Sequence, residues 1–221
     1  QPYTSWTWQN MNGNTTLITK AADMAVGKGI VVVNSAGNNG FNSSHNTLNA
    51  PADGDSVLTV GATTAGGTRA AFSSVGPTTS IPARIKPDVM AQGTTVHCAS
   101  PTGPTGYTYQ QGTSLSCPLA AGVVALILRA KPNATPMQVA DAMRLTASQA
   151  NAPDNLMGWG LVNAVAAIDY ITRGGSPPTS FRLTDSYPNP FPTPTNPSTI
   201  IGFILAEQSE VTLKIFNTLG Q

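Results

Sequence analysis

A hydroxyl group at the start of an apolar helix is the feature of this sequence best suited to chemistry. Residues 112–118 read Gly-Thr-Ser-Leu-Ser-Cys-Pro, and the apolar run 119–128 follows them directly. Ser114 is therefore predicted in the first turn of a helix, where backbone N–H groups are unpaired and the helix dipole is positive. Such fixed donors stabilise an oxygen that becomes negative during a reaction. The pattern fits either a nucleophile or a plain helix cap, whereas the Gly-x-Ser-x-Gly elbow of esterases is disfavoured because Ser116 replaces its last glycine.

The composition is that of a globular chain with few charges. Of the 221 residues, 40% are hydrophobic and 10% are charged, and the net charge is +1. This length allows one good core and a small appendage. The charge gives no reason to expect a nucleic acid or an anionic membrane as partner, and no apolar run comes near the roughly 18 residues of a membrane span. Low charge together with many Gly, Pro, Asn, Ser and Thr residues suggests an extracellular protein.

Two cysteines, Cys98 and Cys117, leave the redox state open. Pairing them would suit an oxidising compartment. We favour two buried free thiols, because a free cysteine behaves as a small hydrophobic residue.

The elements that must position Ser114 alternate between helix and strand. A helix capped by Asn14 is predicted, then a strand over residues 30–33, whose four β-branched side chains suggest burial on both faces. The Ser114 helix is apolar on all sides, which places it in the interior. The other expected elements are a buried strand over 56–61, a loop-rich stretch over 62–100, and helices that begin near 135 and 164. This order predicts an α/β domain with a largely parallel sheet.

Two motifs in the same chain resemble those of the subtilisin-like serine peptidases, or subtilases. Residues 112–118 are similar to the nucleophile motif of that family. About 75 residues earlier, residues 31–38 (Val-Val-Val-Asn-Ser-Ala-Gly-Asn) are similar to its strand and loop with the oxyanion-hole asparagine. The likeness covers about 170 residues and includes segments 50–62, 72–77, 86–89 and 158–164. It implies part of a subtilisin-like three-layer domain with a mostly parallel sheet.

The resemblance implies acyl transfer on protein or peptide substrates. Ser114 Oγ would attack a peptide carbonyl, and the Asn38 side-chain amide with the Ser114 backbone N–H would hold the oxyanion. In this family the backbone and small side chains of Ser35, Ala36 and Gly37 form one wall of the pocket for the residue before the scissile bond. The opposite wall is expected from a segment that ends just before Gln1.

A serine hydroxyl needs a base, which in this family is a histidine oriented by an aspartate. In subtilases both precede the nucleophile, in the order Asp, His, Ser. The two histidines of this chain, His45 and His97, both follow Asn38, and neither lies in a catalytic motif. We interpret them as loop or surface residues. The triad Asp and His are expected upstream of Gln1, and the 221-residue chain alone is expected to be inactive.

The resemblance implies no required cofactor. A structural calcium ion is compatible with the family, but Asp53 and Asp55 are as readily interpreted as turn residues. The alternative to an enzyme is a surface-bound pseudopeptidase that keeps the fold as a binding or adhesive scaffold. Ser114 and Asn38 together favour the enzyme, because a scaffold has no physical need for that pair.

The composition changes after the predicted peptidase part, residues 1–173. Residues 174–185 have the composition of a linker, and strand alternation follows within residues 186–221. Three segments closely resemble the C-terminal sorting domain of type IX secretion substrates: 186–191, 196–203 and 211–220. The resemblance implies a partial small β-sandwich, recognition by outer-membrane secretion machinery, and a secreted or cell-surface location in a Gram-negative bacterium. The alternative is a Pro/Thr-rich linker followed by an adhesive β domain of fibronectin type.

Overall fold

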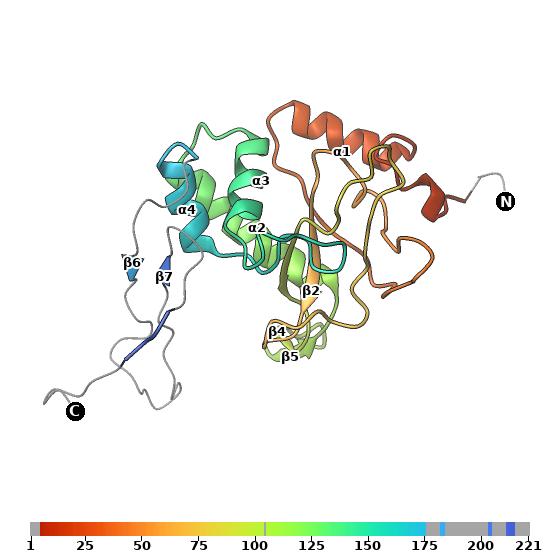
Figure 1. The fold of residues 1–221 in the computed structure, drawn as a ribbon. Coiled ribbons are helices and arrows are strands. Elements are labelled where there is room, and N and C mark those ends of the chain that lie inside the picture. The colour runs from red at the N-terminus through yellow and green to blue at the C-terminus, as the bar shows by residue number, and fades with distance from the viewer. Residues whose placement is uncertain (1–4, 104, 176–181, 184–202, 205–210, 215–221) are drawn as a thin grey trace, which may run out of the picture. The chain divides into compact units, whose positions relative to one another are not determined.

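The computed structural model describes residues 5–103, 105–175, 182–183, 203–204 and 211–214. The chain divides into two units, Gln1–Gly175 and Ser176–Gln221, and Figure 1 shows the elements of both. The first unit contains a 3₁₀ turn, five strands and four helices among its described residues. These are η1 (Trp8–Asn10), α1 (Leu17–Gly27), β1 (Val33–Ser35), β2 (Leu58–Thr63), β3 (Val89–Gln92), β4 (Val96–Ala99), β5 (Tyr107–Gln110), α2 (Thr113–Ala130), α3 (Pro136–Leu145) and α4 (Ala164–Thr172).

A parallel sheet forms the centre of the first unit, as the sequence predicts. Its order is β1-β2-β3, with Val33 opposite Leu58 and Val60 opposite Val89. Every residue of the middle strand β2 is buried. Burial at every position, Thr59 and Thr63 included, is typical of a strand covered on both faces. The α/β fold class is therefore confirmed.

Helix α2 covers one face of this sheet and packs against α3 and α4 (Figure 1). The resulting core consists of buried residues from the sheet and the three helices: Leu58, Val60, Val89, Ala91, Ala120, Val124, Ile127, Val139, Ala140, Ala142, Met143, Ala147, Ala167 and Ile171. Small alanines alternate with branched side chains in this set, which allows helices and sheet to approach closely. The core anchors the helix that begins at the predicted nucleophile.

The first helix and strand both begin later than predicted. Thr16, rather than Asn14, caps α1, and its hydroxyl accepts a hydrogen bond from the backbone N–H of Thr19 at 3.2 Å. Strand β1 begins at Val33 instead of residue 30. Its side chains are half-buried rather than buried on both faces, because β1 is an edge strand of the described sheet and pairs there only with β2.

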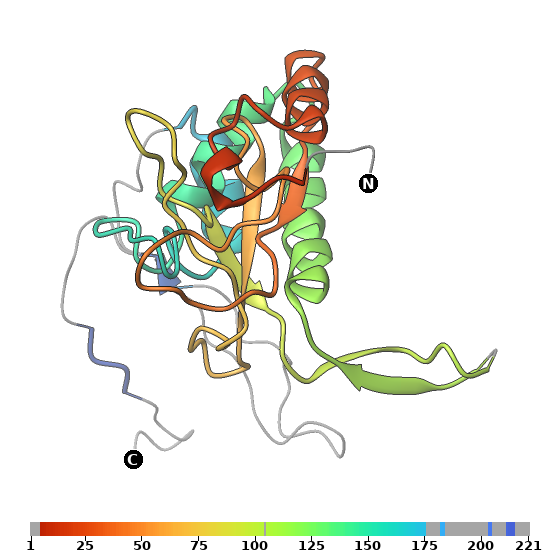
Figure 2. The same ribbon diagram turned by 90° about the vertical axis from the view of Figure 1, so that its right-hand side faces the viewer.

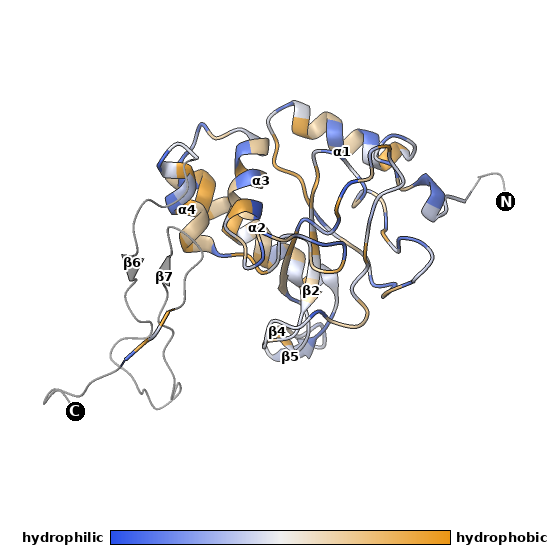
Figure 3. Cartoon of the chain, in the orientation of Figure 1, coloured by the Kyte–Doolittle hydropathy of each residue, from blue (hydrophilic) through white to orange (hydrophobic). Residues whose placement is uncertain are grey.

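Helix α2 is buried on one side only, which corrects the expectation that all its sides lie in the interior. Val124 and Ile127 face the core, whereas Leu119 and Leu126 are 47% and 53% exposed. Figure 3 shows apolar residues on α2 and α4 and a mixture of apolar and polar residues on α3. The sequence pattern shows that the helix is apolar. It cannot tell which side of the helix packs against other elements, since those elements are distant in the chain.

Helix α2 also corrects the expectation that no apolar run approaches the length of a membrane span. It has 18 residues and a mean hydropathy of 1.6, so by length and composition alone it meets the usual criterion. The helix nevertheless packs against all three strands of the sheet and against α4. This is the arrangement of the core helix in a globular domain.

An antiparallel hairpin begins inside the stretch 62–100, which we expected to be loop-rich and which also contains β3. Strands β4 and β5 pair with His97 opposite Tyr109, and the hairpin extends away from the rest of the first unit (Figure 2). His97 lies 5.0 Å from the rings of both Tyr107 and Tyr109. Strand β5 ends three residues before α2, so the hairpin leads directly into the helix of Ser114.

A buried charge cluster ties the sheet to α3. Lys86 Nζ donates to Asp88 Oδ2 and to the Val57 carbonyl, both at 2.7 Å, and Arg144 Nη2 lies 2.8 Å from Asp88 Oδ1. The Arg144 guanidinium also lies over the Trp159 ring, 5.5 Å from its centroid. Burial lowers the pKa of Lys86, and the attraction of Asp88 opposes this shift. Burial alone would raise the pKa of Asp88, but Lys86 and Arg144 outweigh it and lower that pKa.

The second unit contains one described strand pair, β6 (Arg182–Leu183) antiparallel to β7 (Phe203–Ile204). Strand β6 falls inside residues 174–185, and the assignment of that stretch as a linker stays a prediction. Residues 211–214 are assigned to no helix or strand, and Val211 and Leu213 are exposed, although alternation predicted a half-buried strand there. The rest of the predicted sorting domain lies outside the described residues.

Candidate active site

Ser114 is an exposed residue in the first turn of α2. Gly112 precedes the helix with φ of 144°, a backbone conformation that residues with a Cβ rarely adopt. The Gly112 N–H donates to the Gly93 carbonyl at 2.8 Å, and its own carbonyl accepts from the Leu115 N–H at 3.0 Å. The glycine thus allows the chain to turn sharply out of the hairpin and present the serine at a helix N-terminus.

Asn38 is joined to the residue before the predicted nucleophile. Its side-chain oxygen Oδ1 accepts hydrogen bonds from the Thr113 backbone N–H and from the Thr113 hydroxyl, both at 2.9 Å. The Thr113 hydroxyl oxygen in turn accepts from the Gly37 N–H at 3.3 Å. Three hydrogen bonds therefore connect the loop after β1 to the first turn of α2, and two motifs about 75 residues apart meet at one site.

These contacts determine which way the Asn38 amide points. Because Oδ1 is held by two donors, the amide nitrogen Nδ2 is left on the other side of the group as a donor. It has no acceptor in the hydrogen bonds found among the described residues, and Asn38 is exposed. A fixed, unpaired N–H donor beside an exposed serine at a helix N-terminus is an arrangement that can stabilise an oxyanion.

The loop that carries Asn38 is hydrogen-bonded to the segment around Ser74. The Ser74 N–H donates to the Gly37 carbonyl at 3.0 Å, and Ser74 Oγ accepts from the Asn39 N–H at 3.1 Å. Gly37 has a φ of 115°, and a Cβ there would approach Ser74 Oγ within 2.7 Å. The glycine is therefore required for both its backbone conformation and this close contact.

An open pocket of about 470 Å³ has Asn39, the residue after Asn38, in its lining. On one side it is lined by Asn39 and Asn49, whose side chains are joined by a hydrogen bond of 2.7 Å. The N-terminal segment with Trp6, Thr7 and Trp8 also lines it. Neither Asn49 nor the two tryptophans lies in a recognisable motif. The wall of the substrate pocket expected from a segment that ends just before Gln1 stays a prediction.

Ser35, Ala36 and Gly37 lie at the end of β1 and in the turn that follows it. Ala36 and Gly37 are buried, and Ser35 is half-buried. The Ala36 carbonyl accepts a hydrogen bond from the Asn49 N–H at 3.1 Å. Ala36 thus binds the backbone of one lining residue of the pocket, and contact of Ser35, Ala36 and Gly37 with substrate stays a prediction.

Neither histidine is joined to Ser114 by a hydrogen bond found among the described residues. His45 stacks on Trp8, with ring centroids 5.0 Å apart and an interplanar angle of 9°, and its Nδ1 lies 2.7 Å from the Asn46 carbonyl oxygen. His97 lies on the exposed hairpin between two tyrosine rings. Both have structural contacts of their own, as expected for residues outside a catalytic motif.

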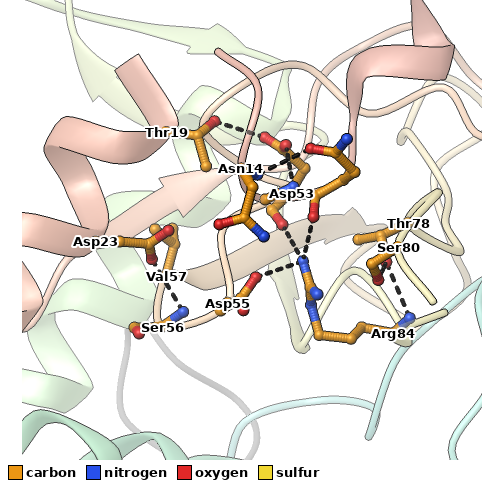
Figure 4. A network of polar contacts seen from close by, with 12 residues as sticks. Asn14, Thr19, Asp23, Asp53, Asp55, Ser56, Val57, Thr78, Ser80 and Arg84 are labelled. Atoms are coloured by element: carbon orange, nitrogen blue, oxygen red, sulfur yellow. Dashed lines mark hydrogen bonds and ion pairs between the residues drawn. The ribbon is translucent and has the colours of Figure 1, made fainter. Parts of the chain in front are cut away.

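Asp53 and Asp55 are engaged by protein partners (Figure 4). The buried Asp53 carboxylate accepts from the Gly13 N–H and the Thr19 hydroxyl, both at 2.8 Å. Asp55 forms an ion pair with Arg84 at 2.6 Å. Over the described part of the chain, no group of three His, Cys, Asp or Glu side chains is arranged to hold a metal ion. A structural calcium ion stays an expectation of the resemblance.

The two cysteines are free and half-buried. Cys98 Sγ lies 3.6 Å from the Thr108 carbonyl, within the hairpin. Cys117 lies on α2 one turn after Ser114, and burial raises the pKa of its thiol. The interpretation as free thiols is thus confirmed, although neither side chain is fully buried.

Solved protease structures share this fold. A protease from Pseudoalteromonas arctica PAMC 21717 matches with a TM-score of 0.54 and 32% identity, covering 68% of this chain and 45% of that one. The prenylagaramide maturation protease PagA matches with a TM-score of 0.57 and 27% identity, covering 69% and 55%. The architecture around Ser114 is therefore that of an α/β protease.

Sequence comparison defines the family. Subtilisin DY from Bacillus licheniformis is 40% identical over 153 residues, which are 69% of this chain and 52% of the relative. The profile of the subtilase family, Peptidase S8, matches residues 4–160. The chain belongs to the subtilase family of serine peptidases. It spans about half the length of the curated subtilisin that it matches.

Proposed function

We propose that this chain is the nucleophile-bearing part of a secreted, subtilisin-type serine endopeptidase. The observation that carries the proposal is the pair of hydrogen bonds from Thr113 to Asn38 Oδ1. These bonds leave the Asn38 amide N–H free beside the exposed Ser114. The family membership supports it independently.

The proposed reaction is hydrolysis of a peptide bond through an acyl-enzyme. Ser114 Oγ attacks the substrate carbonyl carbon, and the carbonyl oxygen becomes an oxyanion held by Asn38 Nδ2 and the Ser114 backbone N–H. The base takes the serine proton and passes it to the leaving amine as the C–N bond breaks. Water then attacks the acyl-enzyme with help from the same base, which returns its proton to Ser114 Oγ as the acid product leaves.

The base in this proposal is a histidine oriented by an aspartate, and both lie outside this sequence. The contacts of His45 and His97 support this view, since His45 is bound to Trp8 and Asn46 and His97 to the two hairpin tyrosines. The 221-residue chain alone is accordingly inactive. No cofactor takes part in the proposed reaction.

The proposed substrates are proteins or peptides bound in the pocket next to Asn38. Its lining consists of apolar, amide and hydroxyl side chains together with His45, and it includes no Lys, Arg, Asp or Glu. An uncharged side chain before the scissile bond suits such a lining, because an ionised group would lose its hydration without a partner. Ser35, Ala36 and Gly37 would position the substrate backbone at the edge of this pocket.

A fluorophosphonate probe, which labels activated serines, tests the proposal. We expect Ser114 to be labelled in the full-length protein and to be unmodified in the 221-residue chain. Ser114→Ala in the full-length protein is the matched control and should abolish the label. No labelling of the full-length protein would instead support a catalytically dead scaffold, and labelling of the 221-residue chain would show that a base is present in it.

We further propose that residues 186–221 belong to a type IX sorting domain, which would direct the protein to the cell surface or medium of a Gram-negative bacterium. The support is the sequence resemblance of three segments. Deleting residues 186–221 from the full gene should leave the protein inside the cell. Unchanged delivery to the medium would contradict the sorting role and favour an adhesive β domain.

A further inference from the structure

One side of α1 is both apolar and exposed. Leu17, Ala21 and Met24 recur there at helical spacing, and Leu17 and Met24 are 78% and 70% exposed. The opposite side of the helix buries Thr19 and Val26. An amphipathic helix in a folded domain normally turns its apolar stripe toward the core. The stripe of α1 faces solvent instead, which marks it as a contact surface for another element.

The exposed side of α2 is also apolar, and it carries the predicted nucleophile. Ser114, Leu119, Gly122 and Leu126 are all exposed, whereas Ile127 is buried in the core. The helical period places the four exposed residues on one side of α2. Whatever covers Leu119 and Leu126 therefore lies on the same side of the helix as Ser114.

Strand β1 forms an open edge of the described sheet beside these helices. Alternate residues around β1 are bonded to β2, from Leu58 N to the Val32 carbonyl and from Ala36 N to the Val60 carbonyl, both at 2.9 Å. Successive residues of a strand direct their backbone groups to opposite edges, so those of Val33 point away from β2. Figure 2 shows α1 (red), β1 (orange) and α2 (green) on the right-hand side of the view.

We call this surface the uncovered face. It consists of the open edge of β1 and six exposed apolar side chains, Leu17, Ile18, Met24, Ile30, Leu119 and Leu126. A lipid bilayer does not suit it, because hydrocarbon cannot bond the backbone groups of a strand edge. A polypeptide suits both parts, since a strand can pair with the edge while apolar side chains pack on the helices.

The position of Ser114 indicates which polypeptide covers the face. A catalytic base must come within hydrogen-bond reach of Ser114 Oγ. Ser114 lies on the exposed side of α2, so the polypeptide that brings the base must lie against that side. In the proposed function this base lies upstream of Gln1. A second copy of this chain would bring only His45 and His97, which have structural contacts of their own.

We propose that the uncovered face is the docking surface for the part of the protein that precedes Gln1. This part pairs a strand with β1, and the two parts hold together without the peptide bond that joins them. The proposal rests on the proposed function in one respect, that the base lies upstream of Gln1. Docking itself requires neither Ser114 nor a base, so it can be tested apart from peptidase activity.

The first test cuts the full-length protein between its two parts. A recognition sequence for a site-specific protease is placed directly before Gln1 in the Ser114→Ala variant, which cannot digest itself. After cutting, we expect the two pieces to co-elute in size-exclusion chromatography at about 1 µM. Leu126→Lys should weaken their association by at least about tenfold, because a charge replaces an apolar contact.

Ile81→Lys is the matched control for Leu126→Lys. Ile81 is a fully exposed apolar residue outside the uncovered face, so this change should leave the association as it is. Circular dichroism of the 221-residue chain should be the same for both variants and the parent, since both side chains are exposed there.

Hydrogen exchange followed by NMR tests the strand pairing. The Val33 amide should exchange at least about tenfold more slowly in the cut complex than in the 221-residue chain alone, because pairing at the open edge would protect it. The Ala36 amide already donates to the Val60 carbonyl, so its exchange should change little.

Separation of the two pieces after cutting would overturn the proposal, as would unchanged exchange at Val33 or equal effects of Leu126→Lys and Ile81→Lys. A dimer of the 221-residue chain that Leu126→Lys dissociates, without binding of the upstream piece, would assign the face to a second copy. The fluorophosphonate label, applied to cut protein that keeps Ser114, reports on the peptidase proposal separately. Pieces that co-elute without taking the label would contradict that proposal and leave the docking surface standing.

Discussion

Asn38 Oδ1 accepts two hydrogen bonds from Thr113, one from its backbone N–H and one from its hydroxyl, each at 2.9 Å. This contact joins the loop after β1 to the first turn of α2. It gives the Asn38 amide one orientation, with the nitrogen available as a donor next to Ser114. A single pair of residues thus determines how the two motifs meet and which atom of the Asn38 amide is left as a donor.

The substitution Asn38→Asp should separate these two roles in the full-length protein. The carboxylate that it introduces would keep an acceptor for Thr113 but would have no N–H for the oxyanion. We expect kcat to fall by about 10²–10³, as for other lost oxyanion donors, with little change in KM. Steady-state kinetics on a peptide substrate measure this.

Asn38→Leu is the companion variant, because it removes the donor and the acceptor together. It should show the same loss of kcat and an additional loss of unfolding free energy of about 1–2 kcal/mol from the two broken bonds to Thr113. If Asn38→Asp keeps parental activity, Asn38 has no role in holding the oxyanion.

Gly112→Ala should destabilise the chain through its backbone conformation. The φ of 144° is strained for any residue with a Cβ, while the added methyl group would meet its nearest neighbour, Asn38 Nδ2, only at an ordinary 3.5 Å. We expect a loss of about 1–3 kcal/mol in unfolding free energy, measured by urea denaturation.

Gly122 provides the matched control for this substitution. It lies inside α2, and a Cβ there would meet nothing within 4 Å. Gly122→Ala should stabilise the chain by up to about 1 kcal/mol, because alanine is the better helix former. Equal effects of the two substitutions would show that Gly112 is not under conformational constraint.

Asp88→Asn should strongly destabilise the fold. The substitution removes the negative charge that Lys86 and Arg144 share. Lys86 is fully buried and Arg144 is largely buried, so neither could replace that partner with water. Removing one partner from a buried ion cluster typically costs about 3–5 kcal/mol. Asp141→Asn is the control, since Asp141 pairs with the same Arg144 but is exposed, and it should change stability by less than about 1 kcal/mol.

The lowered pKa of Asp88 also predicts acid sensitivity. In the folded state this carboxyl stays ionised below its ordinary value of 3.8, so the unfolded chain binds the proton first as the pH falls. The contribution of Asp88 is thus fully present above that value and is lost as the pH falls toward its folded pKa. Urea denaturation at a series of acidic pH values should show a smaller pH dependence in Asp88→Asn than in the parent.

Cys117 should react with alkylating reagents more slowly than Cys98. Burial raises the pKa of the Cys117 thiol, which lowers its thiolate fraction near neutral pH. Mass spectrometry after iodoacetamide treatment at about pH 8 would compare the two, with Cys98→Ser and Cys117→Ser to assign the sites. Faster modification of Cys117 would mean that the dipole of α2 outweighs burial at this position.

Local signals in the sequence predicted much of this protein. The helix expected to begin near residue 135 begins at Pro136, and Thr135 and Gln138 form a reciprocal capping box there. Helix α2 begins at Thr113, so Ser114 lies in its first turn as predicted. These features depend on residues a few positions apart, where propensity and backbone geometry are sufficient.

Only the tertiary structure decided the features that depend on distant residues. The motifs of Asn38 and Ser114 indicated a nucleophile and an oxyanion donor, but the orientation of the Asn38 amide depends on Thr113, about 75 residues away. The pocket walls of Trp6 and Asn49 likewise come from separate segments with no shared pattern. Sequence by itself therefore determined the fold class, the family resemblance and the chemical groups. Their mutual geometry was decided by long-range packing and hydrogen bonding, which no local pattern encodes.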